Sequence, residues 1–259
     1  MATPSLRSLE KALDLLGRIV ESGEVHSIAD LARQINMPHS TAYRIAATLE
    51  RSGLVTRMRR GYYLPGPSLI RLARHDSIPR VLKAIGRPII KTLATATGCT
   101  AHVGIFENGM VTYLLKAGRA AHTVFTREGT QLEAYCTGIG KVLLAALPVS
   151  AREEYLKSGP FIQLTASTLT DPQKLRSELI IVGDRGYAED NAEMDSGLLC
   201  LAVPVRFGEG DVIAALSIST RSKDEDSHAL LTHLDALRTA ATLLSNRLTS
   251  RAEIAKQPK

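Results

Sequence analysis

Residues 27–52 read SIADLARQINMPHSTAYRIAATLERS, and this stretch predicts two amphipathic helices separated by a short turn. Apolar residues recur at the i, i+3, i+4, i+7 spacing that places side chains on one face of a helix. They are Ile28, Leu31, Ala32 and Ile35 in the first helix, and Ala42, Ile45, Ala46 and Leu49 in the second. Ser27 is a candidate N-cap. Pro38 lacks an N–H group and has a fixed φ, so it ends the first helix and suits the first turn of the second. The two apolar faces can therefore pack against each other.

The second helix leaves a different set of side chains exposed, close to its N-terminus. These residues are His39, Ser40, Tyr43, Arg44 and Ala47. Such an arrangement is typical of the recognition helix of a helix-turn-helix. An arginine can pair with guanine, and hydroxyl groups and the helix N-terminus can bind phosphate. An ordinary helical hairpin with a solvated polar face would show the same pattern, so the flanking sequence has to decide between the two.

A basic hairpin follows the helix pair. Residues 53–56 and 61–64 predict two short strands around a tip at residues 57–60, and residues 51–75 contain six arginines and no acidic residue. Such a charge distribution attracts a polyanion. A basic hairpin behind a recognition helix indicates a wing, which favours DNA binding over a solvated hairpin. The predicted DNA contacts are Ser27, His39, Ser40, Thr41, Tyr43 and Arg44 in the helices, and Arg57, Arg59 and Arg60 in the wing.

Length and composition set the broad class. The chain has 259 residues, 44% of them hydrophobic, which favours two domains with packed cores. It contains no apolar run long enough to cross a bilayer and no secretory signal, so we expect a cytoplasmic protein without membrane contact. Its three cysteines are far apart, which fits reduced thiols. The net charge is +6, and residues 1–76 carry eleven Lys and Arg against seven Asp and Glu, which favours a nucleic-acid partner for this part.

Two helical regions flank the predicted DNA-binding module. A stripe of apolar residues predicts an N-terminal helix that covers the helix pair and completes a three-helix core; it consists of Leu6, Leu9, Leu13, Leu16 and Val20. This gives a first domain at residues 1–66. Residues 67–98 predict two helical segments that form a linker. The second segment has more apolar positions than a free linker needs, so part of it should pack against the next domain or another subunit.

From Cys99 onward the pattern changes to short strands mixed with helices. Strands are predicted at residues 100–106, 111–116, 122–126, 198–205 and 212–220, and helices at residues 138–147, 151–157, 171–183 and 230–248. The last helix carries an apolar stripe that can cover a sheet. The fold class is therefore α+β, and the tail after Arg251 should be frayed.

Several segments resemble the IclR (isocitrate lyase regulator) family of bacterial transcriptional regulators. The matching segments are LEKALDLLGRI, PHSTAYRIAATLERSGLV, TGIGKVLLAAL, and RGYAEDNAEMDSGLLCLAVPV followed by VIAALSIST. The resemblance implies a winged helix-turn-helix at residues 1–66, a helical linker at 67–98, a GAF-like α/β effector-binding domain with a mostly antiparallel sheet at 99–251, and a tail at 252–259. It implies a ligand-responsive regulator of a catabolic pathway, acting as repressor or activator.

The resemblance also implies an effector pocket, formed by Gly138, Ile139, Asp190, Cys200, Ser217 and Ser219. Ser217 and Ser219 are two positions apart on a predicted strand, so their hydroxyl groups share a face; on an edge strand that face would be solvent. Asp190 could instead be a loop carboxylate or an N-cap, and Lys141 a solvated charge on the helix; we interpret Lys141 as structural. The loop before the helix at Gly138 can bind an anion through free N–H groups, which favours a small organic acid as the effector.

Other functions fit the sequence less well. A zinc site built from His102, Cys136, Asp190 and Cys200 has no ligand spacing signature, so we expect no metal and no cofactor. An enzyme would need a nucleophile and base, for which the chain offers only scattered thiols and the carboxylates of Asp190, Glu193 and Asp195. A sequence-blind DNA-coating protein would not need the large apolar C-terminal half. We therefore expect a homodimer, or a dimer of dimers, on a double-stranded pseudopalindromic operator, because two-fold symmetry requires matching half-sites.

Overall fold

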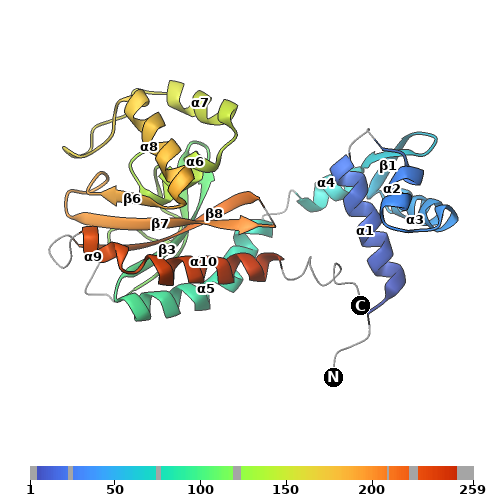
Figure 1. Ribbon diagram of the computed structural model, residues 1–259, viewed down its shortest axis with the longest axis horizontal. Helices are drawn as coiled ribbons and strands as arrows, with labels where there is room; N and C mark the ends of the chain where they lie inside the picture. Colours follow the sequence, from blue (N-terminus) through green and yellow to red (C-terminus); the bar gives the residue numbers. More distant parts are fainter. Residues whose placement is uncertain are drawn as a thin grey trace. The chain divides into compact units, whose positions relative to one another are not determined.

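The computed structural model describes residues 5–22, 26–73, 77–118, 124–208, 210–221 and 227–249. The chain folds into two compact units that divide after Ser77 (Figure 1). The N-terminal unit has one hydrophobic core, and the C-terminal unit, Ile78–Arg251, has two that lie on opposite faces of a sheet. No helix within the described ranges is long and apolar enough to span a membrane.

The N-terminal unit contains the predicted helix pair and wing. Its elements are α1 (Arg7–Ser22), α2 (Ile28–Gln34), α3 (His39–Arg51), β1 (Val55–Arg59), β2 (Tyr62–Pro65) and α4 (Pro67–Ala73). The apolar faces predicted for α2 and α3 form the core of this unit. The wing is confirmed, but its tip is tighter than expected, because β1 continues through Arg59 and the chain reverses at Arg60 and Gly61.

Ser27 is confirmed as the N-cap of α2. Its hydroxyl accepts a hydrogen bond from the Asp30 N–H, and the Asp30 carboxylate accepts one from the Ser27 N–H in return. This reciprocal capping box satisfies two N–H groups that the helix itself cannot. Pro38 occupies the N-cap position of α3 and has no side-chain cap to offer.

The prediction that the apolar stripe from Leu6 to Val20 covers α2 and α3 is wrong for most of its residues. The fully buried side chains of α1 are Leu15 and Ile19, whereas Leu6 is 70% exposed and Leu13 is 58% exposed. The helix has apolar residues on more than one face. Leu16 of the predicted stripe packs against this core, but the buried contacts of the helix come from the face that carries Leu15 and Ile19. An apolar stripe of α1 therefore stays uncovered within one chain.

The C-terminal unit is built on a six-stranded sheet in the order β5-β4-β3-β8-β7-β6, with every pairing antiparallel. The strands are β3 (Thr100–Glu107), β4 (Met110–Ala117), β5 (Gln131–Glu133), β6 (Ala188–Asn191), β7 (Leu198–Phe207) and β8 (Asp211–Arg221). The strand predicted at residues 122–126 is wrong as far as the structure describes it: residues 124–126 are not in a strand, and residues 122 and 123 lie outside the described residues. β4 pairs with β3 on one side and with β5 on the other.

Helices cover both faces of this sheet (Figure 1). One face packs against α6 (Gly138–Ala146) and α8 (Pro172–Arg185), with α7 (Val149–Lys157) beside α8. The other packs against α5 (Ser77–Thr97), α9 (Ser227–Leu231) and α10 (Leu234–Thr249). The second half of the expected linker is therefore part of this unit, because Leu82, Ile90 and Leu93 of α5 are buried in its core. The boundary lies at Ser77, not at residue 98.

Candidate functional site

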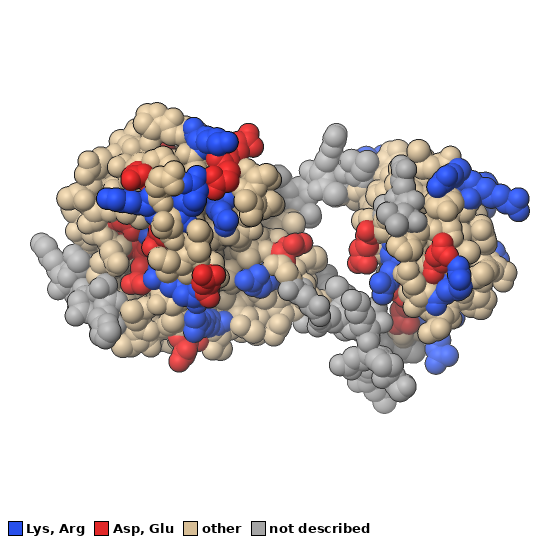
Figure 2. Space-filling view, turned by 45° about the horizontal axis from the view of Figure 1, so that its top comes forward, with Lys and Arg blue, Asp and Glu red and all other residues tan. Residues whose placement is uncertain are grey.

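The first candidate surface lies on α3 and the wing. Of the residues predicted to contact DNA, Thr41 and Ser27 are half-buried, and the others are exposed: His39, Ser40, Tyr43, Arg44, Arg57, Arg59 and Arg60. In Figure 2, basic side chains project from the outer edge of the N-terminal unit. The exposed groups offer hydrogen bonds and positive charge to a partner without any change in the core.

The wing is fixed relative to α2 by short-range contacts. The Ile28 N–H donates a hydrogen bond of 2.7 Å to the Gly61 carbonyl at the wing tip. The Arg59 guanidinium lies 4.0 Å from the centre of the Tyr62 ring, a cation–π arrangement. The Ser27 hydroxyl is held by Asp30, and hydrogen bonds from Ser27 lower the pKa of that carboxyl. The wing and the start of α2 are therefore ordered together.

The second candidate site lies on the face of the sheet that α6 covers. Strand pairing places Asp190, Cys200 and Ser219 side by side on β6, β7 and β8. Ser217 is two positions from Ser219, and both serines are 3% exposed. Because β8 is a central strand and Leu216 and Ile218 belong to the opposite core, the solvent-edge alternative for these serines is wrong. The Ser219 hydroxyl lies 3.2 Å from the Cys200 sulfur.

The N-terminus of α6 lies directly over these strands. A Cβ atom at Gly138 would be 3.7 Å from the Cys200 Cβ, so the backbone there is in near contact with β7. A Cβ atom at Gly140 would be 2.1 Å from the Ala134 carbonyl oxygen, so only glycine allows this approach. Ile139 is 1% exposed and packs into the core beneath. The structure thus brings the residues implied by the family resemblance to one place.

The cap of α6 leaves hydrogen-bond donors at its first turn. The Thr137 hydroxyl accepts from the Gly140 N–H at 3.1 Å, and the Thr137 carbonyl accepts from the Lys141 N–H at 2.9 Å. No intrahelical carbonyl reaches the first N–H groups of a helix. For those of Gly138 and Ile139, the hydrogen bonds found among the described residues include no acceptor. These two donors and the positive end of the helix can stabilise an anion.

Asp190 presents one carboxylate oxygen to this site. Its Oδ1 accepts from the N–H groups of Glu193, at 2.8 Å, and Met194, at 3.4 Å, whereas its Oδ2 is buried and has no partner in the part of the chain that the structure describes. Burial and the neighbouring Glu193 carboxylate raise the pKa of Asp190 to about 7, against the lowering effect of these N–H groups and Lys141. Asp190 belongs to β6, so it is neither a loop carboxylate nor an N-cap.

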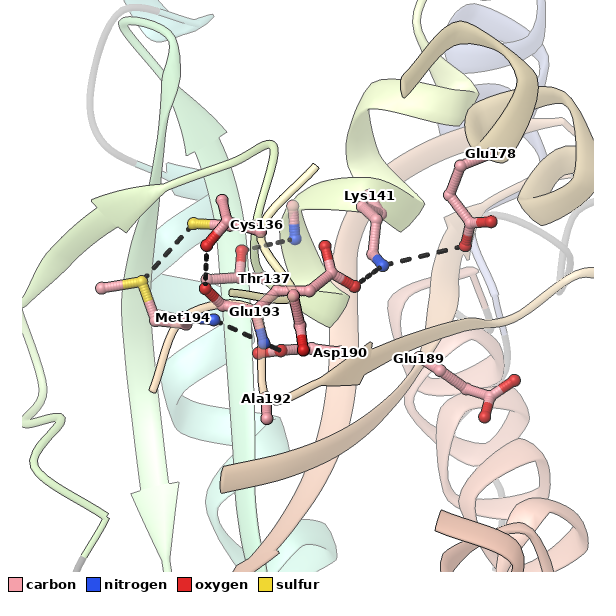
Figure 3. Close-up of polar contacts among 12 residues, drawn as sticks. Cys136, Thr137, Lys141, Glu178, Glu189, Asp190, Ala192, Glu193 and Met194 are labelled. Atoms are coloured by element: carbon pink, nitrogen blue, oxygen red, sulfur yellow. Dashed lines mark hydrogen bonds and ion pairs between the residues drawn. The ribbon is translucent and has the colours of Figure 1, made fainter. Parts of the chain in front are cut away.

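Lys141 forms a buried ion pair beside Asp190 (Figure 3). Its Nζ lies 2.5 Å from Glu193 Oε1 and 3.7 Å from Glu178 Oε1, and only 2% of the side chain is exposed. Burial raises the pKa of Glu193, and Lys141 opposes that effect. The alternative of a solvated helix charge is wrong, and a structural role fits this geometry. The sequence does not predict the pairing with Glu193, because the partners are 52 positions apart.

His102 is a further polar residue of this face that the sequence did not assign to the pocket. Its Nε2 lies 2.9 Å from the Thr126 hydroxyl, and its Nδ1 is buried without a partner among the described residues. Burial and the nearby Lys116 lower the pKa of His102 to about 3, so the ring is neutral. The ring meets that of Tyr113 edge-on, with centroids 5.2 Å apart. Only the strand register, which places His102 opposite Ser217, reveals its position.

The thiols are not activated. Desolvation raises the pKa of Cys200 well above its ordinary value, and burial raises that of Cys136 to about 12. Neither thiol is therefore a nucleophile at neutral pH. Within the described ranges, no group of three or more His, Cys, Asp or Glu side chains could hold a metal ion. The arrangement suits a small molecule held by hydrogen bonds.

Comparison with known proteins gives consistent results over nearly the whole chain. Residues 79–246 match the family described as bacterial transcriptional regulator IclR C-terminal, and residues 8–59 match the IclR helix-turn-helix domain. The transcriptional regulator XynR of Escherichia coli is 32% identical over 249 residues, which cover 95% of this chain and 98% of XynR.

Two solved structures are similar throughout. The Thermotoga maritima IclR structure has a TM-score of 0.61 and 29% identity, covering 94% of this chain and 99% of that one. An IclR homologue from Microbacterium hydrocarbonoxydans, complexed with 4-hydroxybenzoate, has a TM-score of 0.61 and 26% identity, covering 93% of this chain and 99% of that one.

Proposed function

The chain belongs to the IclR family of bacterial transcriptional regulators, and from this premise we propose that a small organic acid, bound in the C-terminal unit, controls its affinity for an operator. The observation that carries the proposal is the α6 N-terminus, where the N–H groups of Gly138 and Ile139 have no acceptor among the described hydrogen bonds and Gly138 lies beside Cys200, the strand neighbour of the buried Asp190 and Ser219. The similar structure with 4-hydroxybenzoate supports an acid of this class.

The acid group would lie against the N–H groups of Gly138 and Ile139. The Ser217 hydroxyl adds a donor from β8, and the Ser219 hydroxyl, which donates to the Cys200 sulfur in the free protein, can turn to the acid instead. Nδ1 of His102, which has no partner among the described residues, offers one further hydrogen bond. These neutral groups, together with the helix dipole, stabilise a carboxylate without requiring a free cation. Lys141 is not such a cation, because Glu193 already neutralises it.

The DNA-binding half would use α3 in the major groove and the wing arginines on phosphates. We propose a homodimer, or a dimer of such dimers, on a pseudopalindromic operator in the cytoplasm, where bacterial DNA lies. The support is the uncovered stripe of α1, in which Leu6, Leu9 and Leu13 are all more than half exposed. A stripe of this kind is a surface that a second copy can bury.

Operator and ligand titrations test the acid site. The operator is selected by the protein from random DNA, and binding is measured with 4-hydroxybenzoate or 4-hydroxybenzamide. The acid should bind and change operator affinity, and the amide should bind more weakly, because it lacks the negative charge. Ser217→Ala combined with Ser219→Ala should weaken acid binding by about 1 kcal/mol or more per lost hydrogen bond and leave ligand-free operator affinity unchanged. Equal binding of acid and amide, or no loss in the double variant, rejects the acid site.

The dimer is tested with a fragment of residues 1–76, since the unit boundary falls at Ser77 and a longer fragment would expose the apolar face of α5. Light scattering should show a dimer at high concentration. Leu9→Lys combined with Leu13→Lys should return it to a monomer without unfolding, because both side chains are exposed in one chain. A fragment that is monomeric before the change rejects the α1 interface.

A further inference from the structure

The charges around the α6 N-terminus do not balance once an acid is bound there. Two buried carboxylates, Asp190 and Glu193, share the site with the buried amine of Lys141, the one buried amine in the described ranges. Lys141 is paired with Glu193 at 2.5 Å, with Glu178 also within 3.7 Å. A bound carboxylate would therefore meet the charge of Asp190 without a compensating cation, and such a like-charge contact is costly in a buried site.

The geometry places Asp190 next to the proposed acid position. Asp190 pairs with Cys200 across β6 and β7, and Gly138 lies in near contact with Cys200 from above. Oδ1 of Asp190 is already occupied by two backbone donors, so only Oδ2, which is buried and unpartnered in the described structure, can meet a ligand. A carboxylate oxygen facing a second carboxylate is stable only when one proton lies between them.

We propose that Asp190 holds a proton in the ligand-bound state and donates Oδ2–H to the carboxylate of the effector. This inference rests on the proposed acid site and adds the state in which the acid is bound. The proton comes from solvent and stays on Asp190, so an acid anion that binds while Asp190 is ionised enters together with one proton. Asp190 then selects an acid over an uncharged analogue by supplying a charge-assisted hydrogen bond.

The proton is assigned to Asp190 because the other groups around its carboxyl are paired or neutral. They are Glu193, whose pKa burial also raises but whose charge Lys141 compensates at 2.5 Å, Glu178 next to Lys141, and the neutral side chains of Cys136, Cys200 and Tyr113. Burial raises the pKa of all three neutral side chains, so they keep their protons. Asp190 itself, with a pKa of about 7, exchanges its proton at neutral pH.

Calorimetry of the full-length protein with 4-hydroxybenzoate tests the inference. The charge of this acid is constant between about pH 6 and pH 8. Titrations in two buffers of different ionisation enthalpy give the number of protons taken up. Above the pKa of Asp190, affinity should fall by about tenfold per pH unit and proton uptake should approach one per acid bound. Asp190→Asn, whose amide also donates a hydrogen bond, should bind the acid with no proton uptake and no pH dependence.

Glu189→Gln is the matched control, since Glu189 is the neighbouring residue of β6, points away from Asp190 in Figure 3 and pairs with Arg185 at 3.3 Å. This variant should behave like the unchanged protein. Acid binding with no proton uptake in the unchanged protein overturns the inference and leaves the acid site intact. Proton uptake that persists in Asp190→Asn overturns the role of Asp190. Absence of acid binding at every pH overturns the proposed function itself, and the inference with it.

Discussion

The two units handle polar residues in opposite ways. In the N-terminal unit the core is apolar throughout, and the residues proposed to contact DNA are mainly on the surface. In the C-terminal unit a lysine, an aspartate, a glutamate, a histidine and two serines are almost fully buried on one face of the sheet. Exposed charge suits a long polyanion that the protein must bind and release. Buried polar groups suit a small ligand that is enclosed and recognised by individual hydrogen bonds.

This difference determines what a substitution changes. Exposed ion pairs contribute little to folding, so changes there should affect binding alone. A buried charge that loses its partner carries the full cost of desolvation, so changes in the C-terminal unit should affect folding and binding together. The predictions below compare the two units in order of decreasing effect.

The largest effect is expected for Lys141→Met. Among the described residues, Lys141 supplies the one amine paired with the buried Glu193 carboxylate, and breaking a buried pair from one side costs about 3 to 5 kcal/mol of unfolding free energy. Lys141→Met combined with Glu193→Gln should recover part of that loss, since no uncompensated charge then remains. The free energy of unfolding of both variants is measured by urea titration, and the protection of the sheet amides against hydrogen exchange gives an independent value.

Arg18→Met is the control for this prediction in the other unit. Arg18 and Glu21 are 3.9 Å apart on α1, with 40% and 73% of their side chains exposed to solvent, so the loss should be below about 1 kcal/mol. Equal losses in Arg18→Met and Lys141→Met would show that burial does not separate the two units in the way described above.

The same contrast explains what the sequence could predict. The α2–α3 pair, the wing and the strands β3, β7 and β8 follow from local spacing, because each pattern lies within a few turns or one strand. Which face of α1 is buried cannot be predicted from local spacing. Leu15 and Ile19 have the same spacing as Leu9 and Leu13, and only packing against the other helices selects one pair. The alternating pattern of residues 122–126 predicts a strand, but alternation over five residues does not secure a pairing partner, and residues 124–126 are not in a strand.

The prediction of the pocket residues depends on the family resemblance even more strongly. Ser217 and Ser219 sharing a face follows from strand periodicity. The burial of Lys141, its pairing with Glu193 and the position of His102 opposite Ser217 require contacts between residues far apart in the chain. No spacing rule connects those positions, so residue chemistry alone would have left Lys141 on a solvated helix face.

The next effect concerns pH. Asp190 titrates near 3.8 in the unfolded chain and at about 7 in the folded protein, so its contribution to stability is fully present below 3.8 and is lost as pH rises through 7. Between about pH 5 and pH 8 the loss is about 3 kcal/mol. Asp190→Asn lacks this titration. The difference in unfolding free energy between the variant and the unchanged protein should therefore shift in favour of the variant by that amount from the lower to the higher pH, as measured by hydrogen exchange of β6 and β7 amides without ligand.

Asp30 in the N-terminal unit shifts in the opposite direction. Hydrogen bonds from Ser27 lower the pKa of this exposed carboxyl, so its contribution is present above 3.8 and is lost as pH falls. The protection of α2 amides against hydrogen exchange should therefore decrease in acid. Asp190 contributes most to the stability of the sheet under the same conditions. A parallel pH response of the two units would contradict these assignments.

The smallest effect should separate two arginines of the N-terminal unit by specificity. Arg44 is exposed on α3, the helix proposed to read bases, whereas Arg59 is on β1, where its guanidinium stacks on Tyr62 at the wing. Arg44→Ala should weaken binding to the selected operator by about 1 to 3 kcal/mol and leave binding to random DNA much less changed, because a base contact discriminates between sequences. Arg59→Ala should weaken binding to both DNAs by similar amounts and reduce the salt dependence, because a phosphate contact does not depend on sequence.

Neither change should alter stability, since both side chains lie outside the core. Titrations at fixed salt decide the matter: if Arg44→Ala leaves operator affinity intact, α3 does not read the operator through this residue, and the comparison between an exposed reading surface and a buried pocket loses its first half.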